Sequence, residues 1–113
     1  MKVVPAAIQT LAALGQLQTL APKFVQGENI AQAHHFVATE NAPLGFVAMS
    51  QVFTEGKLTQ GSVWIVPAGL HAPLRQDAVL LKAGQNNAAA IALVTYLRSD
   101  KARAIIRASG YEF

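Results

Sequence analysis

The chain has 113 residues, a length that suits one domain and permits a buried core. Hydrophobic residues make up 52% of it and charged residues only 13%, against about 25% in ordinary soluble domains, so we expect a partner to cover part of the apolar surface. The net charge of +3 is spread over scattered Lys and Arg residues, which argues against a nucleic-acid interface, and the lack of cysteine excludes disulfides and thiolate metal sites.

Short helices are predicted in the first part of the chain. Residues 6–14 are rich in Ala and Leu and are followed by Gly15, a pattern typical of a helix that ends at a glycine. A further helical turn is predicted at residues 16–20. The next helix should begin at Ile30, because Asn29 is a good N-cap and apolar residues then recur at helical spacing. We expect the apolar face of this helix to rest on a sheet.

Apolar runs of strand length follow. Residues 44–49 form a continuous apolar run, as expected for a strand buried on both faces. Residues 23–25, 61–66 and 77–82 also predict strands, and residues 55–57 predict a turn.

Two helices are predicted at the end of the chain. The first is capped at Asn86–Asn87 and runs to about Arg98, and the second follows Ser99–Asp100 and stops near Gly110. The alternation of helices with buried strands predicts an α/β fold with a mixed or parallel sheet flanked by helices.

Neither a metal site nor a catalytic triad is indicated. His34 and His35 are adjacent on a predicted helix and would point about 100° apart, without an acidic residue at ligand spacing. Ser50, His71 and Asp77 lack the glycine-flanked elbow of a nucleophilic serine. We therefore expect no enzyme, no metal and no cofactor.

Seven short segments, in a fixed order and spacing, form the most specific pattern in the chain. They are Leu20-Ala21-Pro22-Lys23, Gly27-Glu28-Asn29-Ile30, Ala42-Pro43-Leu44-Gly45-Phe46-Val47, Trp64-Ile65-Val66-Pro67, Gln76-Asp77-Ala78-Val79, Asn86-Asn87-Ala88 and Gly110-Tyr111. Together they resemble the molybdate-binding family of type II periplasmic binding proteins, over nearly the whole chain from about Ala6 to Phe113.

The resemblance implies a truncated lobe of that fold. Family members have two α/β lobes that close over a tetrahedral oxyanion. Residues 1–83 correspond to part of the second lobe, and residues 84–113 to the C-terminal helices that pack on the other lobe in full-length relatives. The early strands and the serine donors of the first lobe have no counterpart in this chain.

The resemblance also implies the site residues. In the family, neutral donors hold the anion, and the amide of Ile30, first in its helix behind the Asn29 cap, matches one of the amide donors. A second amide, in a proline-containing turn before a helix, falls at Ala6 if Val4-Pro5-Ala6 is that turn. Ala48 stands where some relatives place a tyrosine hydroxyl, so this position contributes no hydroxyl. Amides at a helix N-terminus suit an anion because they carry partial positive charge without a competing proton.

The function that the resemblance implies is the molybdate- or tungstate-binding component of an ABC transporter, working in the periplasm with a membrane permease. The sequence between Met1 and Pro5 lacks the apolar run of a signal peptide, and no apolar run is long enough to span a membrane. The alternative is a self-associating structural module, a homo-oligomer, that has lost anion binding. Its support is the high apolar content, since unpaired strand edges invite exchange between chains.

Overall fold

The computed structural model describes residues 3–113 as short helices and turns joined by long extended segments. The α-helices are α1 Val3–Ala13, α2 Leu17–Leu20, α3 Ile30–Ala38, α4 Met49–Val52, α5 Ala88–Tyr96 and α6 Asp100–Ala108. The 3-10 turns are η1 Ala21–Lys23, η2 Ala68–Leu70 and η3 Lys82–Gly84, and the strands are β1 Phe53–Thr54 and β2 Lys57–Leu58.

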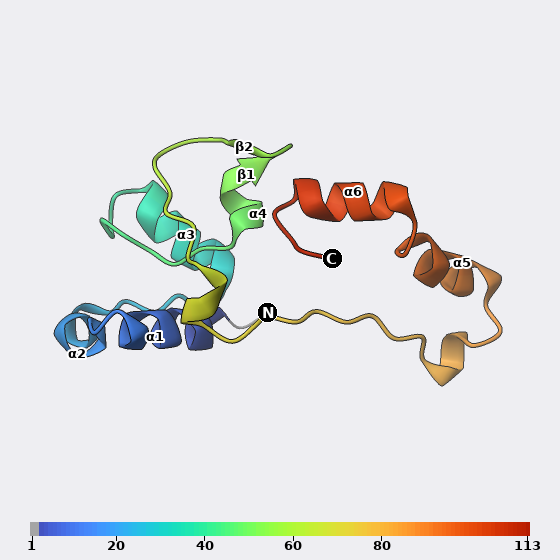
Figure 1. Cartoon of the computed structure of the whole chain (residues 1–113), viewed down its shortest axis with the longest axis horizontal. Helices are drawn as coiled ribbons and strands as arrows, with labels where there is room; N and C mark the ends of the chain where they lie inside the picture. The colour runs from blue at the N-terminus through green and yellow to red at the C-terminus, as the bar shows by residue number, and fades with distance from the viewer. Residues whose placement is uncertain (1–2) are drawn as a thin grey trace.

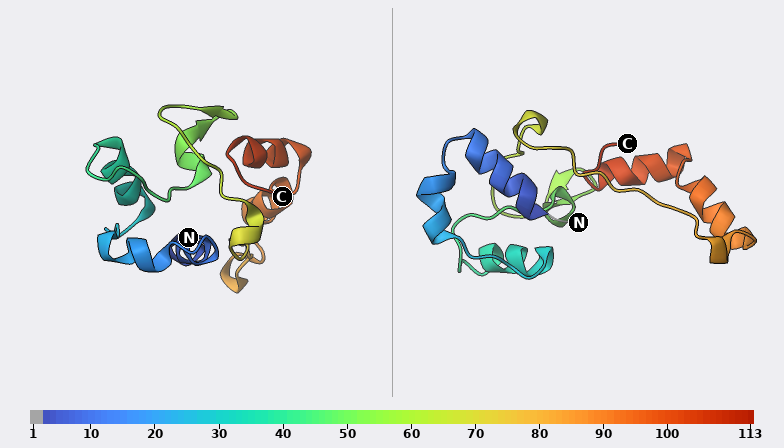
Figure 2. Two further views of the ribbon diagram at one scale, coloured as in Figure 1. Left: turned by 60° about the vertical axis from the view of Figure 1, so that its left-hand side comes forward. Right: turned by 90° about the horizontal axis from the view of Figure 1, so that it is seen from below.

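The molecule is elongated (Figure 1). Helices α1, α2 and α3 lie at one end, and α5 lies at the other, at the tip of an arm that an extended trace reaches. Helix α6 leads back from that arm toward α4 and the β1–β2 hairpin, and the other views show the same arrangement (Figure 2). The principal extents are 53 × 29 × 26 Å and the radius of gyration is 17.2 Å, against about 13 Å for a compact domain of 100 residues.

The helices begin and end where their capping residues dictate. Asn29, Asn87 and Ser99 each accept a hydrogen bond from the first turn of the helix that follows, so α3, α5 and α6 begin as predicted. Gly15 and Gly110 follow α1 and α6 with φ of 68° and 84°, a left-handed conformation that glycine adopts without steric cost. These predictions of helix position are confirmed.

The sheet differs from the prediction. The ladder among residues 3–113 is antiparallel, pairs Phe53 with Leu58 and Thr54 with Lys57, and turns through Glu55 and Gly56 at positive φ. The predicted strands at residues 23–25, 44–49, 61–66 and 77–82 lie mostly outside regular secondary structure and are unpaired within the described part of the chain. A mixed or parallel sheet therefore does not form among residues 3–113. Apolar runs report which residues favour burial, but a strand also needs a neighbour to complete its backbone hydrogen bonds.

The buried core is small and lies mainly in α1. Ala6, Thr10 and Leu11 are buried there, and Ala102 is buried in α6. The η2 turn packs on α1, and the amide of Ala72 donates a hydrogen bond to Oε1 of Gln9 at 2.7 Å. Large apolar side chains such as Leu44 and Val79 are 87% and 79% exposed. The face of α3 that was expected to rest on a sheet has no buried residue.

None of the described helices combines the length and the apolar character that crossing a bilayer requires.

Candidate functional site

Side chains at the start of α3 accept hydrogen bonds from some of the backbone amides there. Asn29 is extended, with φ −149° and ψ 171°, and its Oδ1 accepts a hydrogen bond from the amide of Gln32 at 2.9 Å. Oε1 of Gln32 in turn accepts from the amide of Glu28 at 2.6 Å. The amide of Ala33 donates to the carbonyl of Asn29 at 3.1 Å. Reciprocal capping thus satisfies the amides on either side of the helix start.

The amides of Ile30 and Ala31 remain as the donors of this first turn. Within residues 3–113 neither of them has a protein acceptor. The first turn of any helix leaves such donors, and its dipole adds partial positive charge there. Ile30 is half-buried and Asn29 is exposed, so the helix start can donate hydrogen bonds to an anion.

Because Gly27 has no side chain, its backbone can lie close to the backbone of Asn29 and Ala33 at the start of α3. A Cβ atom at Gly27 would lie 2.8 Å from the amide nitrogen of Ala33 and 3.0 Å from the carbonyl oxygen of Asn29. Both of these atoms belong to the backbone and cannot rotate away. A residue without a side chain is therefore needed at this position.

The side chain of Gln51, which the sequence analysis did not single out, connects Ala48 to the same helix start. Ala48 is the N-cap of α4, and its amide donates to Oε1 of Gln51 at 3.0 Å. Nε2 of the same Gln51 donates to the carbonyl oxygen of Ile30 at 3.0 Å. Two of the predicted site positions, Ile30 and Ala48, are thus bridged by one side-chain amide.

Ala6 occupies a different setting from the one predicted. The turn expected at Val4-Pro5-Ala6 lies inside α1, which begins at Val3. The structure corrects this prediction: Pro5 falls in the first turn of a helix, where a missing N–H is tolerated. Ala6 is buried, and its carbonyl accepts a hydrogen bond from the hydroxyl of Thr10 at 2.8 Å. No hydrogen bond in the described part of the chain joins Ala6 to α3 or α4.

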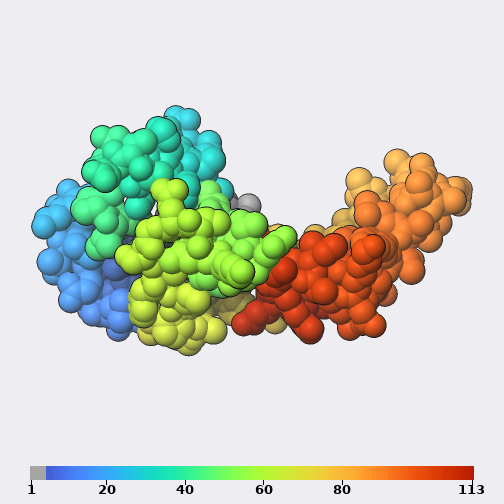
Figure 3. Space-filling model, turned by 90° about the horizontal axis from the view of Figure 1, so that it is seen from above, coloured from blue at the N-terminus to red at the C-terminus, as the bar shows by residue number. Residues whose placement is uncertain are grey.

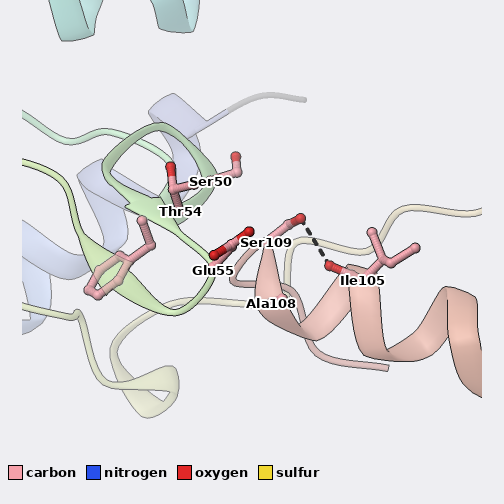
Figure 4. Close-up of a pocket in the computed structure, with 7 residues that line it drawn as sticks. Ser50, Thr54, Glu55, Ile105, Ala108 and Ser109 are labelled. Atoms are coloured by element: carbon pink, nitrogen blue, oxygen red, sulfur yellow. Dashed lines mark hydrogen bonds between the residues drawn. The ribbon is translucent and has the colours of Figure 1, made fainter.

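Two surface hollows are lined by other residues. The larger, of about 450 Å³, lies between the hairpin region and the end of α6 (Figure 4), and the smaller, of about 240 Å³, lies beside Gly15. The larger hollow is lined by Ser50, Phe53, Thr54, Glu55, Ile105, Ala108 and Ser109.

The larger hollow suits an anion poorly. The hydroxyl of Ser109 donates to the carbonyl of Ile105 at 3.0 Å, and the hydroxyls of Ser50 and Tyr111 lie 3.2 Å apart. The carboxylate of Glu55 on its wall would repel a dianion. The candidate anion donors are therefore those at the start of α3 rather than those of the larger hollow.

The histidines do not assemble a metal centre in the part of the chain that the structure describes. Among residues 3–113 no group of three or more His, Asp or Glu side chains is placed to hold an ion. The ring of His71 lies 2.8 Å from the carbonyl oxygen of Ala72, so one of its nitrogens is already used by the backbone.

Comparison with known proteins places the chain in a family. The chain is 58% identical over 106 residues to the molybdate-binding protein ModA of Azotobacter vinelandii, a match that covers 94% of the chain and 42% of the relative. It is 51% identical over 107 residues to the molybdate-binding protein ModA of Rhodobacter capsulatus, covering 94% and 41%. The chain thus spans less than half the length of these relatives.

A solved structure gives the same result for the fold. The structure of a periplasmic molybdate-binding protein of Azotobacter vinelandii matches with a TM-score of 0.84 and 36% identity, over 96% of this chain and 48% of that one. This match confirms the predicted α/β class, that of a periplasmic binding-protein lobe, although few of its strands are paired in residues 3–113.

A match to a family-wide sequence model shows which family the chain belongs to. The model of the bacterial extracellular solute-binding protein family matches residues 3–112. The proteins of this family bind solutes and are not enzymes, and molybdate appears in the relatives' names as a bound solute rather than a cofactor, as the sequence analysis predicted. The chain belongs to the bacterial extracellular solute-binding protein family.

Proposed function

We propose that the chain contributes one side of a binding site for a tetrahedral oxyanion, molybdate or tungstate, in a substrate-binding component of an ABC transporter. The observation that carries the proposal is the start of α3, where the amides of Ile30 and Ala31 have no protein acceptor in the described structure. Oriented amides bind a desolvated dianion without bringing a proton that it could remove.

The role of the other positions follows from their setting. Asn29 shapes the helix start and Ala48 lies beside it, so both would line the site without supplying a hydroxyl. Ala6 stays a proposed site position through the family resemblance alone, because the turn expected to present its amide is part of α1. In the proposed arrangement, residues 1–83 form part of one lobe and residues 84–113, with α5 and α6, pack on the other lobe. A membrane permease is the proposed partner, as the family resemblance implies, and the periplasm is the proposed location, as the name of the solved relative suggests.

The proposal is tested by calorimetric titration of the chain with molybdate, tungstate and sulfate. Ile30→Pro is the informative variant, because proline is compatible with the first position of a helix and Asn29 already has the extended backbone that a residue before proline requires. The variant removes one N–H from the site while α3 persists. Loss of a charge-assisted hydrogen bond, at about 1.5–3 kcal/mol, should weaken binding by roughly 10- to 150-fold.

Two variants serve as controls. Ile30→Ala keeps the amide and should retain most of the affinity. Ala88→Pro makes the same change at the first position of α5, behind the extended Asn87, and should leave binding unchanged. Absence of binding to all three anions by the unaltered chain would contradict the proposed function.

A second candidate function is that of a self-associating module. It is favoured by the exposure of large apolar side chains on segments whose backbone is unpaired in the described structure, among them Trp64, Val79 and Leu81. Exposed apolar patches and unpaired edges of this kind mark surfaces that another chain covers. A homo-oligomer of this type and anion binding do not exclude each other.

A further inference from the structure

The side chain of Gln51 spans two parts of the chain that are far apart in sequence. One end of its amide accepts from the amide of Ala48, three residues before it, and thereby caps α4. The other end donates to the carbonyl of Ile30, 21 residues before it, in the first turn of α3. Gln51 is half-buried, so water competes only partly for these hydrogen bonds.

We propose that Gln51 is a positioning residue that holds the start of α3 against the start of α4, and so fixes the orientation of the planar peptide unit that joins the carbonyl of Ile30 to the amide of Ala31, one of the two proposed donors. This inference rests on the proposed function of that amide. The carbonyl that Gln51 engages lies in the same planar peptide unit as the amide of Ala31 and on the same residue as the amide of Ile30.

Two features make glutamine suited to this role. Its amide has a donor at one end and an acceptor at the other, and the geometry uses both: Oε1 toward an N–H and Nε2 toward a C=O. It is also uncharged, so it adds no negative charge beside a site for a dianion. A glutamate would keep the bond to Ala48 but would turn a second acceptor toward the carbonyl of Ile30, which removes the bridge and adds repulsion.

The local structure leaves α3 dependent on such a bridge. Helix α3 has no fully buried residue, and its cap at Asn29 is exposed, so no core side chain fixes the helix against its surroundings. Close packing between Gly45 and the side chain of Val37 constrains the far end of the helix. The bond from Gln51 constrains the end that carries the proposed donor.

The test compares Gln51→Glu and Gln51→Met with the unaltered chain by anion calorimetry and by NMR of labelled protein. Gln51→Glu should keep the Ala48 amide protected from hydrogen exchange, whereas Gln51→Met should lose that protection. Both should shift the carbonyl carbon signal of Ile30 and weaken molybdate binding about tenfold or more. If Gln51→Met does not fold, Gln51→Glu still tests the bridge, because its cap at Ala48 is intact.

Gln60→Glu is the matched control, since it makes the same chemical change at an exposed residue, and it should alter neither signal nor affinity. An unshifted Ile30 carbonyl signal, or equal affinities of Gln51→Glu, Gln60→Glu and the unaltered chain, would overturn the role of Gln51 and leave the proposed function standing. Failure of the unaltered chain to bind any anion would remove the proposed function and this inference together.

Discussion

At the scale of single residues, Asn29 and Ile30 have different roles at the start of α3: the first caps the helix and the second is a proposed anion donor. The Asn29 side chain satisfies the amide of Gln32, and the amide of Ile30 at the front of the helix has no acceptor among residues 3–113. Capping therefore defines which amides are occupied and which can meet an anion.

Replacing Asn29 by Asp separates the effect of this residue on helix capping from its effect on anion binding. Aspartate accepts the same hydrogen bond from Gln32, and its negative charge favours a helix N-terminus, so the stability of α3 should be kept or rise by up to about 1 kcal/mol. The same charge would repel a dianion, so molybdate affinity should fall by at least about tenfold. Circular dichroism and calorimetry measure the two effects.

Asn87→Asp provides the comparison, because Asn87 caps α5 in the same way. It should stabilise its helix similarly and leave anion binding unchanged. Equal anion affinity of Asn29→Asp and Asn87→Asp would show that the start of α3 does not face the ligand.

The sequence was informative about residues whose role is local. Asn29 and Ile30 could be predicted because a cap and the first helical residue are neighbours in the chain. Gln51 could be predicted only in part: its spacing from Ala48 matches a cap, but its bond to Ile30 depends on how the segment between them folds back. The prediction for Ala6 was wrong about local structure. We expected Val4-Pro5-Ala6 to form a turn before a helix, but the same residues also fit the first turn of α1.

At the scale of elements, the structure depends on close contacts between backbone segments. The glycine before α3 allows residues 27–29 to lie against the first turn of the helix, where a methyl group would meet the amide of Ala33. The position of the helix start thus depends on a residue that supplies no interaction of its own.

Gly27→Ala should therefore displace the start of α3. Its Cβ would come within 2.8 Å of backbone, and relieving such overlap typically costs about 1–3 kcal/mol. Faster hydrogen exchange at the amides of Gln32 and Ala33 should report the change. Gly69→Ala is the control, because nothing lies within 4 Å of its Cβ position. Similar exchange rates in the two variants would show that the contact at Gly27 is not required.

Helices were predicted better than strands for a physical reason. A helix completes its hydrogen bonds within one segment, so caps at Asn29, Asn87 and Ser99 suffice to locate it. A strand depends on a second segment, and residues 61–66 and 77–82 find none among the described residues. The β1–β2 hairpin forms because its two strands are joined directly by the predicted turn at Glu55 and Gly56.

At the scale of the whole molecule, the high apolar content and the elongated shape both indicate a surface that a partner covers. The chain is extended, with an arm that carries α5 (Figure 3), and many of its large apolar residues are exposed. Helix α5 is apolar over nearly all of its length and has no buried residue, although such a helix is usually surrounded by protein. The arm is thus a surface that another chain, or another part of the fold, would cover.

Sedimentation should therefore give a mass above that of one chain, and a charge on the arm should lower it. Val79→Glu places a carboxylate on an exposed apolar segment of the arm, whereas Gln85→Glu adds the same charge at a polar position nearby. We expect Val79→Glu, but not Gln85→Glu, to shift the equilibrium toward single chains, because burying an unpaired charge is costly. A strictly monomeric unaltered chain would contradict the self-associating module.

The central claim is that main-chain hydrogens at the start of α3 bind an oxyanion, and amide NMR of the labelled chain during a molybdate titration tests it most directly. The account predicts that the amide signals of Ile30 and Ala31 shift downfield and saturate together, while that of Ala88, at the start of α5, stays in place. Signals of Ile30 and Ala31 that do not move while the chain binds molybdate elsewhere, or that move no more than that of Ala88, would contradict it.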